Sequence, residues 1–390
     1  MKFNFIGNAC CEYEAGGKKL LCDPWLEPGA FYGSWFHYPP LKHTVDDIKN
    51  ADYLYISHIH PDHYCKITLD AFRRDIPIII LEHLSPFLLN KLTQDGFTNI
   101  TTMKDKQSKN FGPFKVTMFA PFSKHPFYYS EIGNLIDSAI IVESGGVKYL
   151  NTNDNMPDID TAKMLGEKYG PFHVAQLNFN CAGMFPSCAK HLSIDDRKKA
   201  SVELKQRNIL HLVELYKVIN AHAIMPFAGE YVIGGKNIDK NAYLGTMTSA
   251  EACRMLDNFK VPCILTGEDM GEMKREEYIQ SLKKKKYDYE SDKPTIITDE
   301  KWRRSCANFR SACKRYGYTC KIGIKVNRRV VTDETAKGRI DFEMPGALLS
   351  GIIDRKYHWN NAEIGCLIEF WRSPDNYDPD LHTMMSFFHA

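Results

Sequence analysis

The chain has 390 residues, of which 44% are hydrophobic and 25% charged, a balance typical of a soluble globular protein with more than one domain. Its 50 basic and 48 acidic residues give a formal net charge of +2, which excludes a basic field of the kind that recruits nucleic acid. Every apolar stretch is shorter than the roughly 20 residues of a membrane span, and no signal-peptide core opens the chain. We therefore expect a cytoplasmic protein that binds neither nucleic acid nor a membrane.

The first half of the chain predicts strands and helices in alternation. Residues 2–7 and 18–23 are expected to form a hairpin closed by Gly16 and Gly17. An aromatic loop over residues 25–38 follows, and it either covers a pocket or packs on the core. As a lid it would bring Trp25 and Tyr32 to a substrate. The elements expected next are strands at 52–57, 78–81, 98–102 and 115–120, with helices at 66–75 and 84–94.

A second round of alternation predicts the fold class. Strands are expected at 138–143, 147–151, 174–179 and 222–227, with helices at 158–168 and 193–219. Two β-rich halves, each closed by helices, indicate an α/β protein built as a four-layer αββα sandwich. We expect this catalytic domain over residues 1–235, a helical extension and linker over 236–300, and a small C-terminal α+β unit over 301–390.

The densest polar cluster follows the predicted strand at 52–57. It reads Ser57-His58-Ile59-His60-Pro61-Asp62-His63. His58 and His60 alternate with Ile59, so in extended backbone both rings project to the same side and can bind one cation together. Asp62 and His63 follow on a turn and can bend back towards them. Burying three unpaired imidazoles has a high desolvation cost, which favours a metal site with two adjacent positions over an ordinary polar turn.

This motif resembles the signature of the metallo-β-lactamase superfamily, which implies a mononuclear or dinuclear site between two sheets. By this resemblance His58 and His60 hold the first metal, and Asp62 and His63 hold the second. His125 matches the third ligand of the first metal, and Asp154 matches the carboxylate that bridges the two. The resemblance thus makes His58, His60, Asp62, His63, His125 and Asp154 the metal ligands, with Asp62 and Asp154 also catalytic.

A second resemblance covers most of the chain. Cys22-Asp23-Pro24-Trp25-Leu26, Leu150-Asn151-Thr152 and Pro226-Phe227-Ala228-Gly229 are similar to the catalytic part of the CMP-N-acetylneuraminate hydroxylase family. That family implies two iron ions and the hydroxylation of a nucleotide-linked or otherwise anionic sugar. Its members also carry a Rieske domain, whose Cys/His ligand set is missing here, so an oxygenase would need an external electron donor.

Three readings of the function stay open. Many hydrolases of the superfamily supply a last His after a late strand, where this chain has Phe227-Ala228-Gly229. His222, four residues before Pro226, either replaces that ligand or is a buried strand residue, the reading we favour. Open metal positions and His/Asp ligation suit two iron ions and dioxygen, whereas zinc would support hydrolysis of an ester, amide or phosphoester. A binding protein that has lost its chemistry is the third reading.

Three further residues are candidates for substrate contacts. Asn178 follows a predicted strand, and Lys190 and Arg197 lie around the start of the 193–219 helix, where they either contact a phosphate or form a solvated face. The twelve cysteines include no Cys-x-x-Cys pair and are expected to be reduced and buried.

Overall fold

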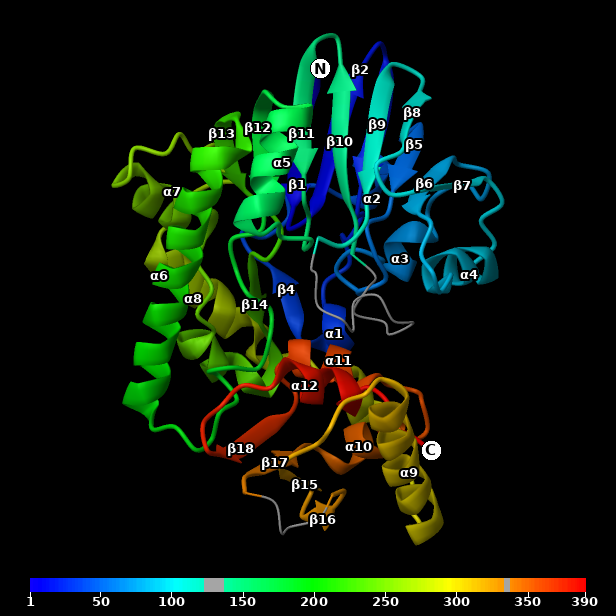
Figure 1. Ribbon diagram of the computed structural model, residues 1–390, viewed down its shortest axis with the longest axis vertical. Coiled ribbons are helices and arrows are strands. Elements are labelled where there is room, and N and C mark those ends of the chain that lie inside the picture. Colours follow the sequence, from blue (N-terminus) through cyan, green and yellow to red (C-terminus); the bar gives the residue numbers. More distant parts are fainter. Residues whose placement is uncertain (123–136, 333–336) are drawn as a thin grey trace.

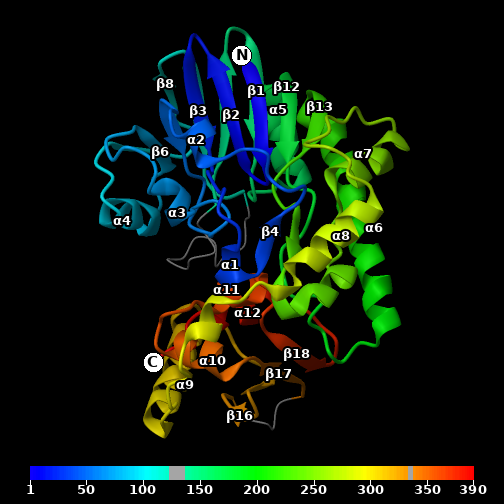
Figure 2. The same cartoon turned by 180° about the vertical axis from the view of Figure 1, so that it is seen from behind.

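The computed structural model describes residues 1–122, 137–332 and 337–390, and its upper part is a four-layer sandwich (Figures 1 and 2). Each of the two central sheets has six strands among the described residues. The first has the order β1 (Lys2–Gly7), β2 (Cys10–Ala15), β3 (Lys18–Cys22), β5 (Tyr53–Tyr55), β6 (Ile78–Leu81) and β7 (Ile100–Met103). The second has the order β13 (Ala221–Pro226), β12 (Phe172–Leu177), β11 (Val147–Asn151), β10 (Ala139–Ser144), β9 (Phe114–Phe119) and β8 (Ser108–Phe111).

Helices cover the outer face of each sheet. On the first sheet these are α2 (Val45–Ile48), α3 (Lys66–Leu69) and α4 (Phe87–Gln94), and on the second α5 (Ile159–Tyr169), α6 (Ile194–Ile219) and α7 (Ser249–Asp257). Alternate strand residues face opposite sides of a sheet, so each sheet contributes to two apolar layers. Tyr13, Leu20 and Ile140, for example, pack between the sheets, whereas Leu54 and Ile78 pack under the helices. The predicted αββα architecture is confirmed.

Two elements of the first sheet differ from the prediction. The strand β2 was not predicted, although Cys11, Tyr13 and Ala15 alternate with Glu12 and Glu14 as they would in a half-buried strand. Glu12 is nonetheless buried, and its carboxylate accepts a hydrogen bond from Lys19 Nζ at 3.0 Å on the next strand. The Gly16-Gly17 turn therefore joins β2 to β3. The helix predicted over 66–75 is also shorter, since α3 ends at Leu69.

The chain beyond Gly235 leads to a separate four-stranded sheet in the lower part of Figure 1. The connecting elements are η3 (Gly235–Tyr243), α8 (Glu272–Ser281), η4 (Leu282–Lys284) and η5 (Asp288–Ser291). The C-terminal elements are α9 (Asp299–Arg315), β15 (Gly323–Val326), β16 (Arg329–Val330), β17 (Arg339–Glu343), α10 (Gly346–Ile353), α11 (Trp359–Ile364), β18 (Glu369–Ser373) and α12 (Pro379–Met385). Their sheet has the order β16-β15-β17-β18. No helix of the described chain is both long and apolar enough to cross a bilayer.

The aromatic loop over residues 25–38 packs on the core and is not a lid. It contains α1 (Ala30–Gly33) and β4 (Trp35–His37), which pairs with β14 (Tyr231–Ile233). Trp25, Phe31 and Trp35 belong to the same apolar cluster as the C-terminal unit. Ser34 Oγ donates to Gly365 O at 2.6 Å and Trp35 Nε1 donates to Ile364 O at 3.1 Å. The loop therefore joins the sandwich to the C-terminal unit.

One pair of cysteines departs from the expected reduced state. Cys253 and Cys263 form a disulfide between α7 and the segment that follows it. Ten other cysteines are free, and Cys181 is exposed rather than buried. Cys306 and Cys313 lie on α9 and are buried as expected, whereas Cys320 lies beyond the end of that helix and is only partly buried.

Candidate metal centre

The histidine cluster lies at the carboxyl end of β5, where the parallel strands β3, β5 and β6 end together. After Ser57 the chain turns back, and the backbone nitrogens of His63 and Tyr64 both donate to the carbonyl of His60. This turn brings His63 beside His58, with ring centroids 4.0 Å apart. Side chains that follow neighbouring parallel strands meet at the same edge of a sheet, which places Asp23, after β3, next to them.

Two groups of side chains could each hold a cation. The first consists of His58, His60 and Asp137, and the second of His58, His63 and Asp154; in each group the ligand atoms lie within 4.8 Å of one another. His58 Nε2 is 3.6 Å from Asp137 Oδ1 and 4.0 Å from Asp154 Oδ2. His58 is therefore shared by both groups. Two imidazoles with one carboxylate form a donor set that non-haem iron uses, and zinc accepts it as well.

Neighbouring groups fix which nitrogen of each ring faces inward. Ser57 Oγ donates to Asp23 Oδ2 at 2.7 Å and so accepts from Nδ1 of His58 at 2.9 Å. Asp23 Oδ2 also accepts from Nδ1 of His63 at 2.9 Å. The lone pairs of His58 Nε2 and His63 Nε2 are thereby left for a cation. A carboxylate that orients the ring of a metal-binding histidine in this way raises its basicity as a ligand.

The ring of His60 is held from the C-terminal unit. Its Nε2 lies 3.1 Å from Oδ1 of Asn360, which is on α11 and 300 residues further along the chain. An amide oxygen only accepts hydrogen bonds, so Nε2 of His60 carries the proton and donates it, and Nδ1 of His60 carries the lone pair. This Nδ1 lies 2.9 Å from Nε2 of His58. Two imidazole lone pairs that converge at this separation fit one cation between them.

Two buried atoms in the cluster have no hydrogen-bond partner within the described protein, His63 Nε2 and Asp62 Oδ1. His63 Nε2 faces Asp154 Oδ2 at 3.4 Å and Asp62 Oδ2 at 3.5 Å. Buried polar atoms are rarely left unpaired, and such exceptions require an explanation. A divalent cation satisfies both atoms, so the residues present fit a metal.

The electrostatics of the cluster also favour a cation. Burial lowers the pKa of His58 well below its usual value, so this ring is neutral and able to bind a metal. Burial also lowers the pKa of His63, but the charges of Asp62, Asp154 and Asp23 outweigh it and raise that pKa well above 6.5. Burial and the charge of Asp154 raise the pKa of Asp137 to about 7. The neighbouring carboxylates therefore keep His63 protonated. A metal ion would take the place of this positive charge.

The site opens to solvent on its carboxylate side. The side chains of Asp137 and Asp154 are 26% and 28% exposed, whereas those of His58 and His63 are fully buried. Asn178 Nδ2 donates to Asp154 Oδ1 at 3.0 Å and leaves Asp154 Oδ2 directed at the histidines. A ligand could thus approach from the side of Asp137 and Asp154 while the rings of His58 and His63 remain buried.

The turn after β13 supports the cluster without supplying a ligand. Gly229 N donates to Asn8 Oδ1 at 2.6 Å, and Asn8 Nδ2 donates to Asp62 Oδ2 at 3.0 Å. Ala228 and Gly229 have φ values of 52° and 101°, a left-handed bend that favours glycine. Where a final histidine was considered, this turn instead orients Asp62 through Asn8. The prediction that His222 is a buried strand residue is wrong, since it is exposed on β13 beside His173.

The buried carboxyl group of Glu230, next to this turn, should make the stability of the protein depend on pH. Burial raises the pKa of Glu230 from 4.5 to about 8, although its carboxylate accepts a hydrogen bond from Ser249 N at 3.0 Å. The unfolded chain loses this proton above pH 4.5, whereas the folded protein keeps it to about pH 8. The contribution of Glu230 to stability is therefore complete below pH 4.5 and is lost as the pH rises towards 8, by roughly 1 kcal/mol per pH unit.

We expect Glu230→Gln to remove this slope. Urea unfolding at pH 5, 6, 7 and 8 should show the variant gaining stability relative to the wild type as the pH rises, because an amide has no proton to lose. Glu272→Gln, which changes an exposed glutamate on α8, is the matched control and should leave the slope unchanged. Parallel curves for Glu230→Gln and the wild type would show that Glu230 titrates normally.

The remaining sequence candidates lie at different distances from the cluster. Trp25 is fully buried and its ring packs on His37, with centroids 3.7 Å apart. Tyr32 is half-buried, and its hydroxyl accepts from His358 N at 2.7 Å. Lys190 forms an ion pair with Glu369 at 2.9 Å, and the guanidinium of Arg197 lies 4.9 Å from the ring centroid of Tyr243. Of these five residues, Asn178 alone forms a hydrogen bond, within the described part of the chain, to a residue of the two candidate ligand groups. His125 lies outside the described residues.

Sequence reasoning missed four residues of this site: Asn8, Asp23, Asp137 and Asn360. Asp23 had a signal, because it follows β3 at the same sheet edge as the histidines. Asp137 precedes β10 by two residues and sits where no local pattern points to a ligand. Asn8 and Asn360 reach the cluster through contacts that span 54 and 300 residues of chain.

Comparison with known proteins relates the N-terminal part of the chain, which contains the histidine cluster, to a known family. Residues 2–135 match the family model of the beta-lactamase superfamily domain. A solved structure of a "possible metal-dependent hydrolase" from Veillonella parvula DSM 2008 aligns with a TM-score of 0.50 and 17% identity, covering 69% of this chain and 97% of that one. This likeness shows the fold alone. Residues 2–135 are thus similar to the beta-lactamase superfamily domain, in agreement with the resemblance that the motif indicated.

Curated relatives extend the similarity beyond that domain. Cytidine monophosphate-N-acetylneuraminic acid hydroxylase of Gorilla gorilla gorilla is 30% identical over 248 residues, which are 60% of this chain and 38% of that protein. A protein of Mycolicibacterium smegmatis, provisionally named as a Rieske 2Fe-2S iron-sulfur protein, is 25% identical over 236 residues, or 59% of this chain and 43% of that protein. The chain spans less than half the length of these relatives.

Proposed function

We propose that this chain is a dinuclear metalloenzyme that hydroxylates a small anionic substrate, such as a nucleotide-linked sugar, with dioxygen and electrons from a separate donor. The observation that carries the proposal is the donor set, in which each group has two imidazoles and one carboxylate and both share His58. Oxygen and nitrogen donors without thiolate suit iron, and three protein donors leave coordination positions open. Similarity to a hydroxylase over 60% of the chain supports the same reading.

Two iron ions in this site would supply the activation of dioxygen and its transfer to a C–H bond. The protein's own part is to hold the ligands and keep water out. Asp23 and Ser57 orient His58 and His63 from a fully buried position, and Asn8 holds Asp62. We assign the bridging role to Asp154, because it faces both His58 and His63 with one oxygen while Asn178 holds the other. His125 remains a proposed ligand of the first metal.

Substrate contacts are proposed on the open side of the cluster. Asn178 borders Asp154 there, and Tyr32 lies next to α11, which carries Asn360. Lys190 and Arg197 would meet a phosphate only by giving up their present neighbours, Glu369 and Tyr243. We propose that Trp25 supports the substrate-binding surface from within the core and does not touch the substrate, since no part of it is exposed. The enzyme is proposed to act in the cytoplasm.

Metal analysis of protein purified without added metal tests this function. We expect two iron ions per chain and consumption of dioxygen when a chemical reductant is supplied. With CMP-N-acetylneuraminate as the trial substrate, mass spectrometry should detect a product heavier by one oxygen atom. Zinc in place of iron, with anaerobic cleavage of ester or phosphoester substrates, would instead establish a hydrolase. Bound metal with neither dioxygen consumption nor cleavage would indicate a binding protein.

A further inference from the structure

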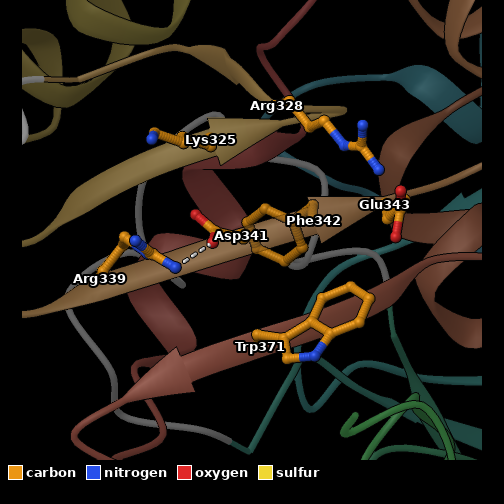
Figure 3. A pocket seen from close by; sticks show the side chains of 7 residues that line it. All are labelled: Lys325, Arg328, Arg339, Asp341, Phe342, Glu343 and Trp371. Carbon is orange, nitrogen blue, oxygen red and sulfur yellow. Dashed lines mark ion pairs between the residues drawn. The ribbon is translucent and has the colours of Figure 1, made fainter. Parts of the chain in front are cut away.

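The outward face of the C-terminal sheet carries a row of three polar and aromatic side chains (Figure 3). Lys325 on β15 is paired with Asp341 on β17, and Asp341 is paired with Trp371 on β18. Their neighbours along the strands, such as Ile340 and Phe370, point inward and are buried. The indole of Trp371 is 36% exposed, although a large aromatic ring is usually covered. An aromatic ring placed beside charges on an open sheet face is a stacking platform for a flat ligand.

This row borders a pocket of about 340 Å³, the size of a small-ligand site. Its other lining residues are Arg328, Arg339, Phe342 and Glu343, so basic and acidic groups both face the space. Arg339 pairs with Asp341 Oδ2 at 2.7 Å. Asp341 itself lines the pocket, and its Oδ1 is buried and has no hydrogen-bond partner among the described residues. Such an atom is satisfied by an N–H donor.

Arg328 occupies a backbone position that arginine disfavours. Asn327 and Arg328 form the two-residue turn between β15 and β16, with φ values of 45° and 66°. A two-residue hairpin turn with two positive φ values prefers Asn-Gly, and arginine in the second place costs conformational free energy. No ion pair of Arg328 is found within the described part of the chain, and its guanidinium lines the pocket. A strained, unneutralised arginine at a pocket is best explained by an anion that it binds.

We infer that this pocket binds a ribonucleoside 5′-monophosphate whose base carries an exocyclic amino group. The base stacks on Trp371 and donates from its amino group to Asp341 Oδ1. The phosphate pairs with Arg328, and Glu343 accepts from the ribose hydroxyls. A single molecule thus satisfies the aromatic, acidic and basic groups together. None of these residues belongs to the metal centre, so this site is additional to the proposed enzymatic activity.

Paired nucleotides test the inference on the full-length wild-type protein. AMP and CMP carry the amino group, whereas IMP and UMP present a carbonyl in its place. We expect calorimetric titration to show that AMP and CMP bind at least tenfold more tightly than IMP and UMP, and that tryptophan fluorescence changes on binding. Inorganic phosphate should bind far more weakly than either. Absence of binding up to 5 mM AMP and CMP, or equal affinity for both members of each pair, would overturn the proposal.

Arg328→Gly separates a binding role from a structural one. Glycine restores the preferred Asn-Gly turn, so the variant should unfold at the same or a higher temperature while its affinity for AMP falls at least tenfold. Arg355→Gly is the matched control, because Arg355 has a φ of 60° but does not line the pocket, and it should bind AMP normally. Trp371→Leu should abolish the fluorescence change. Unaltered AMP affinity in both Arg328→Gly and Trp371→Leu would contradict the assignment.

Discussion

His58→Ala should reduce the metal content of the purified protein to background. His58 is the one side chain shared by both groups of ligands, and its ring is completely buried, so no neighbouring residue or bulk water replaces it easily. Loss of both metals should also abolish activity and any difference in melting temperature between metal-loaded and chelator-treated protein, because a ligand that binds only the folded state stabilises it. Elemental analysis and thermal unfolding provide the two measurements.

Two variants sharpen this result. His60→Ala removes a ligand from one group only, so we expect it to retain about half of the metal that the wild type binds. His222→Ala removes an exposed strand histidine and should keep full metal content. Unchanged metal content in His58→Ala would mean that the cation lies elsewhere and that the proposed site is incorrect.

Asp23→Ala should destabilise the protein more than any change at its surface. The buried carboxylate of Asp23 accepts from Ser57 N and Ser57 Oγ, both at 2.7 Å, and from His63 Nδ1 at 2.9 Å. Alanine leaves these donors buried without an acceptor, and the loss of one partner from a buried charged pair costs about 3–5 kcal/mol. Urea unfolding in the presence of a chelator measures this cost without a contribution from the metal.

The same variant should weaken metal binding. His63 loses the acceptor that holds its Nδ1 proton, and removal of such a supporting carboxylate typically lowers metal affinity about 10–100-fold. Asp23→Asn keeps the shape and one acceptor, so it should lie between alanine and the wild type in both measurements. Asp75→Ala, at an exposed aspartate with a surface ion pair, should change stability by less than about 0.5 kcal/mol. If the Asp23→Ala variant were as stable as the Asp75→Ala variant, the role assigned to Asp23 would be refuted.

Local sequence patterns predicted a strand or helix correctly wherever the residues of that one segment determine its structure. The run Ile78–Leu81 is short, apolar and buried, and it forms a strand as predicted. The long helix α6 begins one residue after Ser193, whose side chain accepts from Asp196 N, as an N-cap should. By contrast, β2 was missed although its apolar residues alternate with Glu12 and Glu14, and only the structure shows that Lys19 on the neighbouring strand pairs with the buried Glu12. The disulfide between Cys253 and Cys263 likewise has no signature in the sequence.

By itself, the sequence determined that a cluster of candidate metal ligands stands at the end of a buried strand in an α/β sandwich, because three imidazoles and a carboxylate within six residues depend only on local spacing. Tertiary structure decided which other groups complete it. Asp137 joins His58 and His60, and Asn360 arrives from the C-terminal unit to orient His60. Contacts between residues so far apart follow from how sheets and helices pack, and packing imposes no period on the sequence.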